Sequence, residues 1–115
     1  MQHRLLVDVI VRPEYIVRYE QADDVTFVHV SVHQWDARVA RQFHDDIEIA
    51  HKMLGRPVYA LDNPGHPNLP KFLRMHGFHP CGHVTDAHGR VVAIYEKSLD
   101  GQCIRRWFPE NHPDS

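Results

Sequence analysis

Cysteine and long hydrophobic runs are both scarce in this chain of 115 residues. Its two cysteines, Cys81 and Cys103, are too few for a disulfide framework, so we expect free thiols in a reducing compartment. No apolar run approaches the roughly 20 residues that a membrane helix needs. The N-terminus also lacks the long apolar region of a secretory signal. These absences predict a cytoplasmic protein that is neither secreted nor inserted in a membrane.

An excess of charge of one sign is missing as well. Thirteen basic and fifteen acidic residues give a net charge of -2 with neutral histidines, which predicts no specific nucleic-acid partner. Histidine, in contrast, is abundant. Protonation of all 11 histidines would add 11 positive charges, so mildly acidic pH should change the surface strongly. The length and the 43% hydrophobic content are those of one ordinary globular domain.

The first third of the chain reads as two strands with a short helix between them. Arg4 to Val11 is an apolar, β-branched run that ends before Pro13. Glu14 to Gln21 has apolar residues at helical spacing and predicts a short helix. Val25 to His33 alternates regularly, with Val28, Val30 and Val32 on one face, and predicts the clearest strand in the chain.

The segment from Ala37 to Leu54 has the pattern of a long amphipathic helix. Asp36 is a favourable N-cap residue, and Gly55 followed by Pro57 ends the helix. Its apolar stripe recurs every three or four residues and should cover the valine face of the preceding strand. The stripe consists of Val39, Phe43, Ile47, Ala50 and Leu54.

The remainder predicts a buried strand, a short helix and a hairpin. The strand is Val58 to Leu61, and the helix follows Asn68 as its cap, with Pro70 in the first turn and Gly77 at the end. Two antiparallel strands, Phe78 to Thr85 and Arg90 to Lys97, complete a domain of residues 1–97. Residues 98–115 read as an irregular tail, with Trp107 and Phe108 as a candidate docking pair.

This order of elements predicts an α/β (α+β) fold with a mixed sheet. The strands 25–33 and 58–61, joined by the long helix, should form its central parallel pair. The long helix and the short helix would cover the sheet, and the hairpin would lie at its C-terminal side.

Residues Val25 to Lys97 resemble the GNAT family of N-acetyltransferases. The resemblance implies that Val25 to His33 is the central strand, that the long helix faces the cofactor, and that Val58 to Leu61 is the strand that splays away from it. The short helix would be the final helix of the family, with its recurrent Gly77-Phe78 ending.

Members of this family hold the pyrophosphate of acetyl-CoA in a loop of glutamine or arginine, two residues, glycine, one residue, and glycine or alanine. Backbone N–H groups bind the phosphates there, and side chains obstruct their approach. The corresponding stretch, residues 33–38, has no glycine and places Trp35 and the acidic Asp36 where the phosphates would lie. We therefore predict a degraded site without a cofactor, and a structural or interaction role with protein partners or self-association.

The alternative is an active N-acetyltransferase that transfers an acetyl group from acetyl-CoA to an amine. His33 or Asp36 would then deprotonate the amine. The cofactor would contact Val32, Trp35, Ala37, Arg38 and Arg41.

The short helix carries two further signals. Family members often have a tyrosine four residues before the Gly-Phe pair as general acid, but Leu73 stands there and has no proton to donate. The cluster Lys71-Phe72-Leu73 is also similar to one in small acetyltransferase-like internal virion proteins of short-tailed phages. This second likeness implies a virion location without catalysis.

Two groups of histidines suggest metal binding as an alternative to ordinary surface residues. One group lies within eight residues, three of them on one face of a predicted strand, and the other group lies on one face of the long helix. An extended strand separates its outer ligands by about 13 Å, too far for one zinc ion, and we expect no metal. The groups are His76, His79, Cys81 and His83, and His44, Glu48 and His51.

Overall fold

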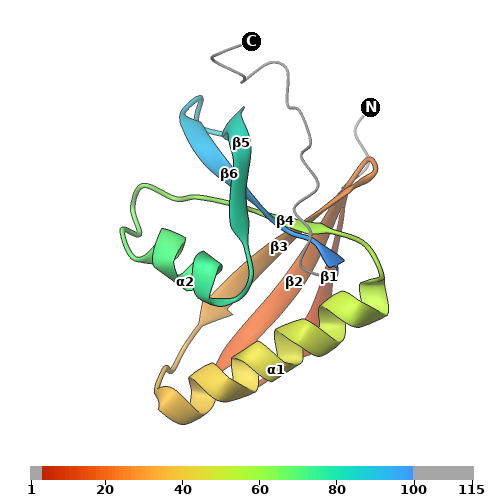
Figure 1. Cartoon of the computed structure of the whole chain (residues 1–115), viewed down its shortest axis with the longest axis vertical. Helices are drawn as coiled ribbons and strands as arrows, with labels where there is room; N and C mark the ends of the chain where they lie inside the picture. Colours follow the sequence, from red (N-terminus) through yellow and green to blue (C-terminus); the bar gives the residue numbers. More distant parts are fainter. Residues whose placement is uncertain (1–3, 100–115) are drawn as a thin grey trace. The chain divides into compact units, whose positions relative to one another are not determined.

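The structure is a computed structural model that describes residues 4–99 (Figure 1). It has the predicted mixed α/β fold, with six strands in a mixed sheet that includes a parallel pair, and two helices. The chain divides into two compact units, Met1–Val58 and Tyr59–Ser115. The candidate docking pair Trp107 and Phe108 lies outside the described residues.

Unit 1 contains an antiparallel three-stranded meander. Its strands are β1 (Arg4–Val11), β2 (Tyr15–Ala22) and β3 (Val25–Val32), with β2 in the middle. Asp23, with a φ of 56°, forms the turn between β2 and β3 in the left-handed region that Asp tolerates better than most residues.

The predicted helix over Glu14 to Gln21 is wrong, because this segment is β2. Its side chains follow the two-residue period of a strand, and Tyr15 and Val17 are completely buried on one face. Both edges of β2 are paired, so that Val17 lies opposite Ile10 on one side and Val30 on the other. The hydrogen bonds of these two ladders pair the backbone N–H and C=O groups along the segment. This pairing outweighs the weak preference of an eight-residue segment for a helix.

Helix α1 (Ala37–Leu54) covers one face of this meander, as predicted. Its buried side chains include Val39, Phe43 and Ile47, and the Phe43 ring packs edge-to-face on Tyr15 at 5.1 Å between centroids. The predicted caps are confirmed: the Asp36 side chain accepts a hydrogen bond from the Val39 amide, and Gly55 ends the helix with a φ of 73°.

Unit 2 consists of β4, which starts at the unit boundary, one short helix and a hairpin. Strand β4 is Val58–Leu61, helix α2 is Leu69–Met75, and the hairpin strands are β5 (His79–Thr85) and β6 (Val91–Lys97). The Asp86 side chain closes the hairpin turn by accepting hydrogen bonds from the His88 and Arg90 amides, both at 2.9 Å. Gly89, with a φ of 77°, supplies the left-handed position in that turn.

The predicted side-chain cap of α2 is wrong in detail. Asn68 occupies the N-cap position with helical dihedral angles and makes no side-chain cap hydrogen bond. The helix entry is instead fixed by backbone turns, in which the amides of His66 and Leu69 donate to the carbonyls of Asn63 and His66. Pro70 occupies the first turn as predicted.

The interior of unit 2 contains polar side chains beside its apolar core. Glu96 is only 1% exposed, and its carboxylate accepts a 2.7 Å hydrogen bond from the Tyr59 hydroxyl. The buried Lys97 ammonium donates to the His76 carbonyl at 2.8 Å. Within residues 4–99, neither helix has the length and apolarity to span a membrane.

Candidate functional site

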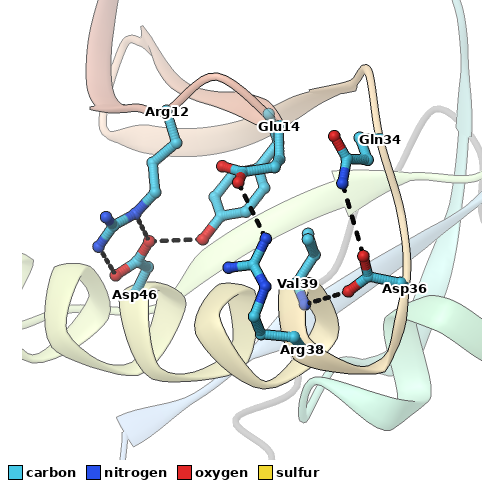
Figure 2. Close-up of polar contacts among 8 residues, drawn as sticks. Arg12, Glu14, Gln34, Asp36, Arg38, Val39 and Asp46 are labelled. Atoms are coloured by element: carbon cyan, nitrogen blue, oxygen red, sulfur yellow. Dashed lines mark hydrogen bonds and ion pairs between the residues drawn. The ribbon is translucent and has the colours of Figure 1, made fainter.

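The residues predicted to form a cofactor or catalytic site belong to one continuous segment of unit 1, made of the end of β3, the loop after it and the first turns of α1. Figure 2 shows Asp36 and Arg38 of this segment. Strand β3 ends at Val32, and helix α1 begins at Ala37. A third segment joins them: Glu14, which immediately precedes β2, lies beside the loop and contacts it through backbone and side chain.

Several backbone N–H groups in and after this loop have acceptors inside the protein. Those of His33 and Gln34 both donate to the Glu14 carbonyl oxygen, at 2.7 and 3.1 Å. At the start of α1, the Val39 amide donates to the Asp36 carboxylate at 2.8 Å, and the Ala40 amide donates to the Asp36 carbonyl at 2.9 Å. Two loop amides and the Val39 amide thus have acceptors inside the protein, and the Ala40 amide makes the first regular hydrogen bond of the helix.

Two carboxylates give this loop a negative charge. The hydrogen bond from the Val39 amide lowers the pKa of Asp36 from its ordinary value. The Arg38 side chain donates to Glu14 at 3.2 Å and lowers the pKa of that carboxyl group. Both groups are therefore ionised at neutral pH, and Arg38 is directed toward Glu14 and forms an ion pair with it (Figure 2).

The other predicted site residues are largely at the surface. His33, Ala37 and Arg41 are exposed, and Val32 is 47% exposed at the end of β3. Trp35 is 42% exposed, and its ring packs edge-to-face on Phe43 at 5.6 Å between centroids. Trp35 therefore anchors the loop to the hydrophobic core of unit 1.

A polar cluster that the sequence did not predict lies next to this loop. The Asp46 carboxylate accepts two hydrogen bonds from the Arg12 guanidinium, at 2.6 and 2.9 Å, and one from the Tyr15 hydroxyl at 2.6 Å (Figure 2). Hydrogen bonding to Arg12 lowers the pKa of Asp46, and burial raises the pKa of Tyr15 to about 12. Arg12 and Asp46 are 34 positions apart, so no local pattern could have indicated their pairing.

The histidine groups do not converge on a common point. His79 and His83 are exposed on β5, whereas His76 is buried, and the Cys81 thiol lies 3.5 Å from the Ile94 carbonyl oxygen. On α1, His44 is exposed and His51 is buried. In the described part of the chain, no three His, Cys, Asp or Glu side chains are grouped so that they could hold a metal ion.

Comparison with known proteins shows which fold the structure resembles. No protein-family model and no curated protein sequence matches the chain. The structure is similar to that of ribosomal-protein-S5-alanine acetyltransferase from Vibrio fischeri, with a TM-score of 0.57 and 17% sequence identity over 75% of this chain. The fold is GNAT-like. The GNAT-like chain spans 54% of the length of that enzyme.

A second solved structure, of a protein assigned as an acetyltransferase from Agrobacterium tumefaciens, has a TM-score of 0.48 and 14% identity. The match covers 85% of this chain and 76% of that protein. The likeness to phage virion proteins through Lys71-Phe72-Leu73 stays a prediction. In the structure these three residues belong to α2, where Leu73 is buried.

Proposed function

We propose that this chain is a GNAT-like domain with a degraded acetyl-CoA site that acts as a structural or interaction protein. The observation that carries it is that the His33 and Gln34 amides of the β3–α1 loop donate to the Glu14 carbonyl, and the Val39 amide in the first turn of α1 donates to the Asp36 carboxylate. A diphosphate needs such amides as donors, because its oxygens can only accept hydrogen bonds. Here those donors already have carboxylate and carbonyl acceptors.

The electrostatics of the loop support the same proposal. A helix N-terminus attracts an anion through its free N–H groups and the helix dipole. At α1 the ionised Asp36 already takes that position, and ionised Glu14 is bound to Arg38. A phosphate group brought to this loop would meet two negative charges, and Arg38 would have to leave its ion pair to bind it.

The residues for catalysis are also poorly suited. The Asp36 carboxylate accepts a hydrogen bond from the Val39 amide, which lowers its pKa. It is therefore a weak base for removing a proton from an amine. Leu73, at the position of the family's tyrosine acid, is 4% exposed and carries no ionisable group. Each residue, taken by itself, therefore does not fit the role that acetyl-CoA chemistry would give it. The more specific role in a phage particle is a separate part of the proposal, and the genes beside this one can test it.

Isothermal titration with acetyl-CoA tests the proposal. The wild-type protein should give no binding heat, whereas Asp36→Gly should gain measurable affinity, because the change removes one negative charge and releases the Val39 amide. Asp86→Gly is the matched control, because Asp86 also binds two backbone amides but does so in the hairpin turn of unit 2. Micromolar binding by the wild type would refute a degraded site.

An active N-acetyltransferase is the alternative, and the similarity to the Vibrio fischeri acetyltransferase favours it. In that case exposed His33, directly after β3, would accept the proton of the amine. Acetyl transfer to a panel of amines should then be measurable and should fall at least a hundredfold in His33→Ala. His88→Ala provides the control, because it removes an exposed histidine of unit 2 that has no assigned part in the site.

A further inference from the structure

The outer edge of unit 1 presents a long, apolar strand. β1 is paired with β2 on one side, and in the described residues 4–99 no strand lies on its other side. An open strand edge offers unpaired N–H and C=O groups to another strand, and proteins ordinarily protect such edges with charges or short strands. Here the edge strand has eight residues and exposes Leu5, Leu6, Val7 and Val9 at 63%, 58%, 43% and 36%.

Helix α1 extends this apolar surface. Asp46 lies on the side of α1 that faces the end of β1, because it binds Arg12. Ile49 and Met53 follow it at three and seven positions, so they continue along the same side of the helix. They are 58% and 83% exposed. α1 runs toward β1 and contacts it, so the helical stripe and the strand edge are neighbours (Figure 1).

Alternate side chains of the strand lie on the same face of the sheet as that stripe. Leu5 and Val7 lie opposite Gln21 and Tyr19 of β2, which share a face with the buried Tyr15 and Val17 under α1. The apolar stripe on α1 and the α1-facing half of β1 are therefore on the same side of the sheet. We name the exposed apolar side chains of the two elements the β1–α1 edge: they are Leu5, Leu6, Val7 and Val9 of β1, with Leu6 on the other face of the sheet, and Ile49 and Met53 of α1.

We propose that the β1–α1 edge binds a second copy of this chain, with the two β1 strands paired antiparallel around a two-fold axis perpendicular to the sheet. Such an axis keeps both α1 helices on the same face, so that Ile49 and Met53 of one copy meet those of the other. Under this axis the strand edge of one copy meets the strand edge of the other, and the helical stripe meets the helical stripe. The surface is therefore self-complementary, as an isologous dimer requires.

The register follows from the strand itself. β1 pairs regularly with β2 from Arg4 to Asp8, and a bulge interrupts the ladder between Asp8 and Ile10. The regular stretch is centred on Leu6. Centring the two-fold axis there places Leu6 opposite Leu6 of the second copy and Leu5 opposite its Val7, whereas an axis at Asp8 would oppose two carboxylates.

The exposed area is of the size that such an interface needs. The six apolar side chains of the β1–α1 edge expose on the order of 600 Å² per copy, close to the roughly 800 Å² per partner of a standard interface. It also reaches the upper end of the ~300–600 Å² found for the largest apolar patch of a typical monomer.

Sedimentation velocity over a concentration series tests this dimer. The wild-type protein should form a dimer, and Met53→Lys should weaken it at least about tenfold, because the change places a charge in the apolar contact between the helices. Met75→Lys is the matched control: Met75 is a 63% exposed methionine on helix α2 of unit 2, and its substitution should leave the dimer unchanged.

Cysteine cross-linking tests the register independently. Under oxidation, Leu6→Cys should give a reducible covalent dimer, because directly opposed residues have Cα atoms about 4.5–5.5 Å apart, within the range of a disulfide. Val91→Cys, at a 64% exposed strand position of unit 2, should remain monomeric on the same gel. Circular dichroism establishes that each variant is folded.

Three results would overturn the proposal. They are a wild-type protein that stays monomeric to about 1 mM, a dimer that Met53→Lys leaves intact, and equal cross-linking of the two cysteine variants. The dimer rests on the proposed function in one respect only: a second copy of the chain would be the partner that the interaction role requires. Failure of the dimer leaves the acetyl-CoA titration unaffected, and acetyl-CoA binding leaves the sedimentation result unaffected, so the two failures are distinguishable.

Discussion

Replacing Phe43 with alanine is expected to reduce the free energy of unfolding by about 3–5 kcal/mol, a large share of the roughly 5–15 kcal/mol that holds a small domain folded. Phe43 is 1% exposed and packs edge-to-face on both Tyr15 and Trp35. Its loss leaves a cavity between α1 and the strands and also removes the contact that anchors the β3–α1 loop. Urea denaturation followed by circular dichroism measures the change.

The control for this experiment is Arg41→Ala, an exposed position two residues earlier on the same helix. It should change the free energy of unfolding by no more than about 0.5 kcal/mol, as is usual for surface positions. A Phe43→Ala variant that loses less than about 1 kcal/mol would show that the core of unit 1 repacks around the vacancy, contrary to a close-packed interior.

Replacing Asp46 with alanine is expected to reduce stability at neutral pH by about 1–3 kcal/mol, because the change removes the acceptor of the hydrogen bonds from Arg12 and Tyr15. Asp46 is the point that ties the end of β1 and the start of β2 to α1. The adjacent Asp45→Ala, at an exposed position, should have little effect.

This loss should also depend on pH. The hydrogen bond from Arg12 lowers the pKa of Asp46 below its ordinary value of 3.8. A lowered folded-state pKa means that the carboxylate stabilises the fold fully above about pH 4, and that this contribution disappears as pH falls through the lower folded-state pKa. The stability difference between wild type and Asp46→Ala should therefore be constant near neutrality and shrink below about pH 4. A difference that grew on acidification would contradict the assigned pairing.

Helix α1 was predictable from the sequence because its signals are local. Asp36, Gly55 and the apolar stripe all lie within the segment that they specify, and each acts over one or two turns. The hairpin was predictable for the same reason, since Asp86 and Gly89 form its turn almost without help from elsewhere. Their observed bounds differ from the predicted ones by at most one residue.

Strand β2 was missed because its conformation depends on its neighbours. Tyr15, Ile16 and Tyr19 have helical spacing, but β1 and β3 supply hydrogen bonds along both edges of the segment. With β2 misassigned, Glu14 had no reason to be placed beside the loop after β3. The contacts of Glu14 with His33, Gln34 and Arg38 were therefore outside what the sequence could indicate.

The sequence by itself determined that residues 33–38 lack glycine and that an aspartate caps the following helix, because both are properties of a short continuous segment. Only the tertiary structure decided that Glu14 accepts the His33 and Gln34 amides, that Arg12 is bound to Asp46, and that β1 is left as an exposed apolar edge. The physical reason is that a capping hydrogen bond spans three residues, whereas strand pairing and burial bring together residues far apart in the chain.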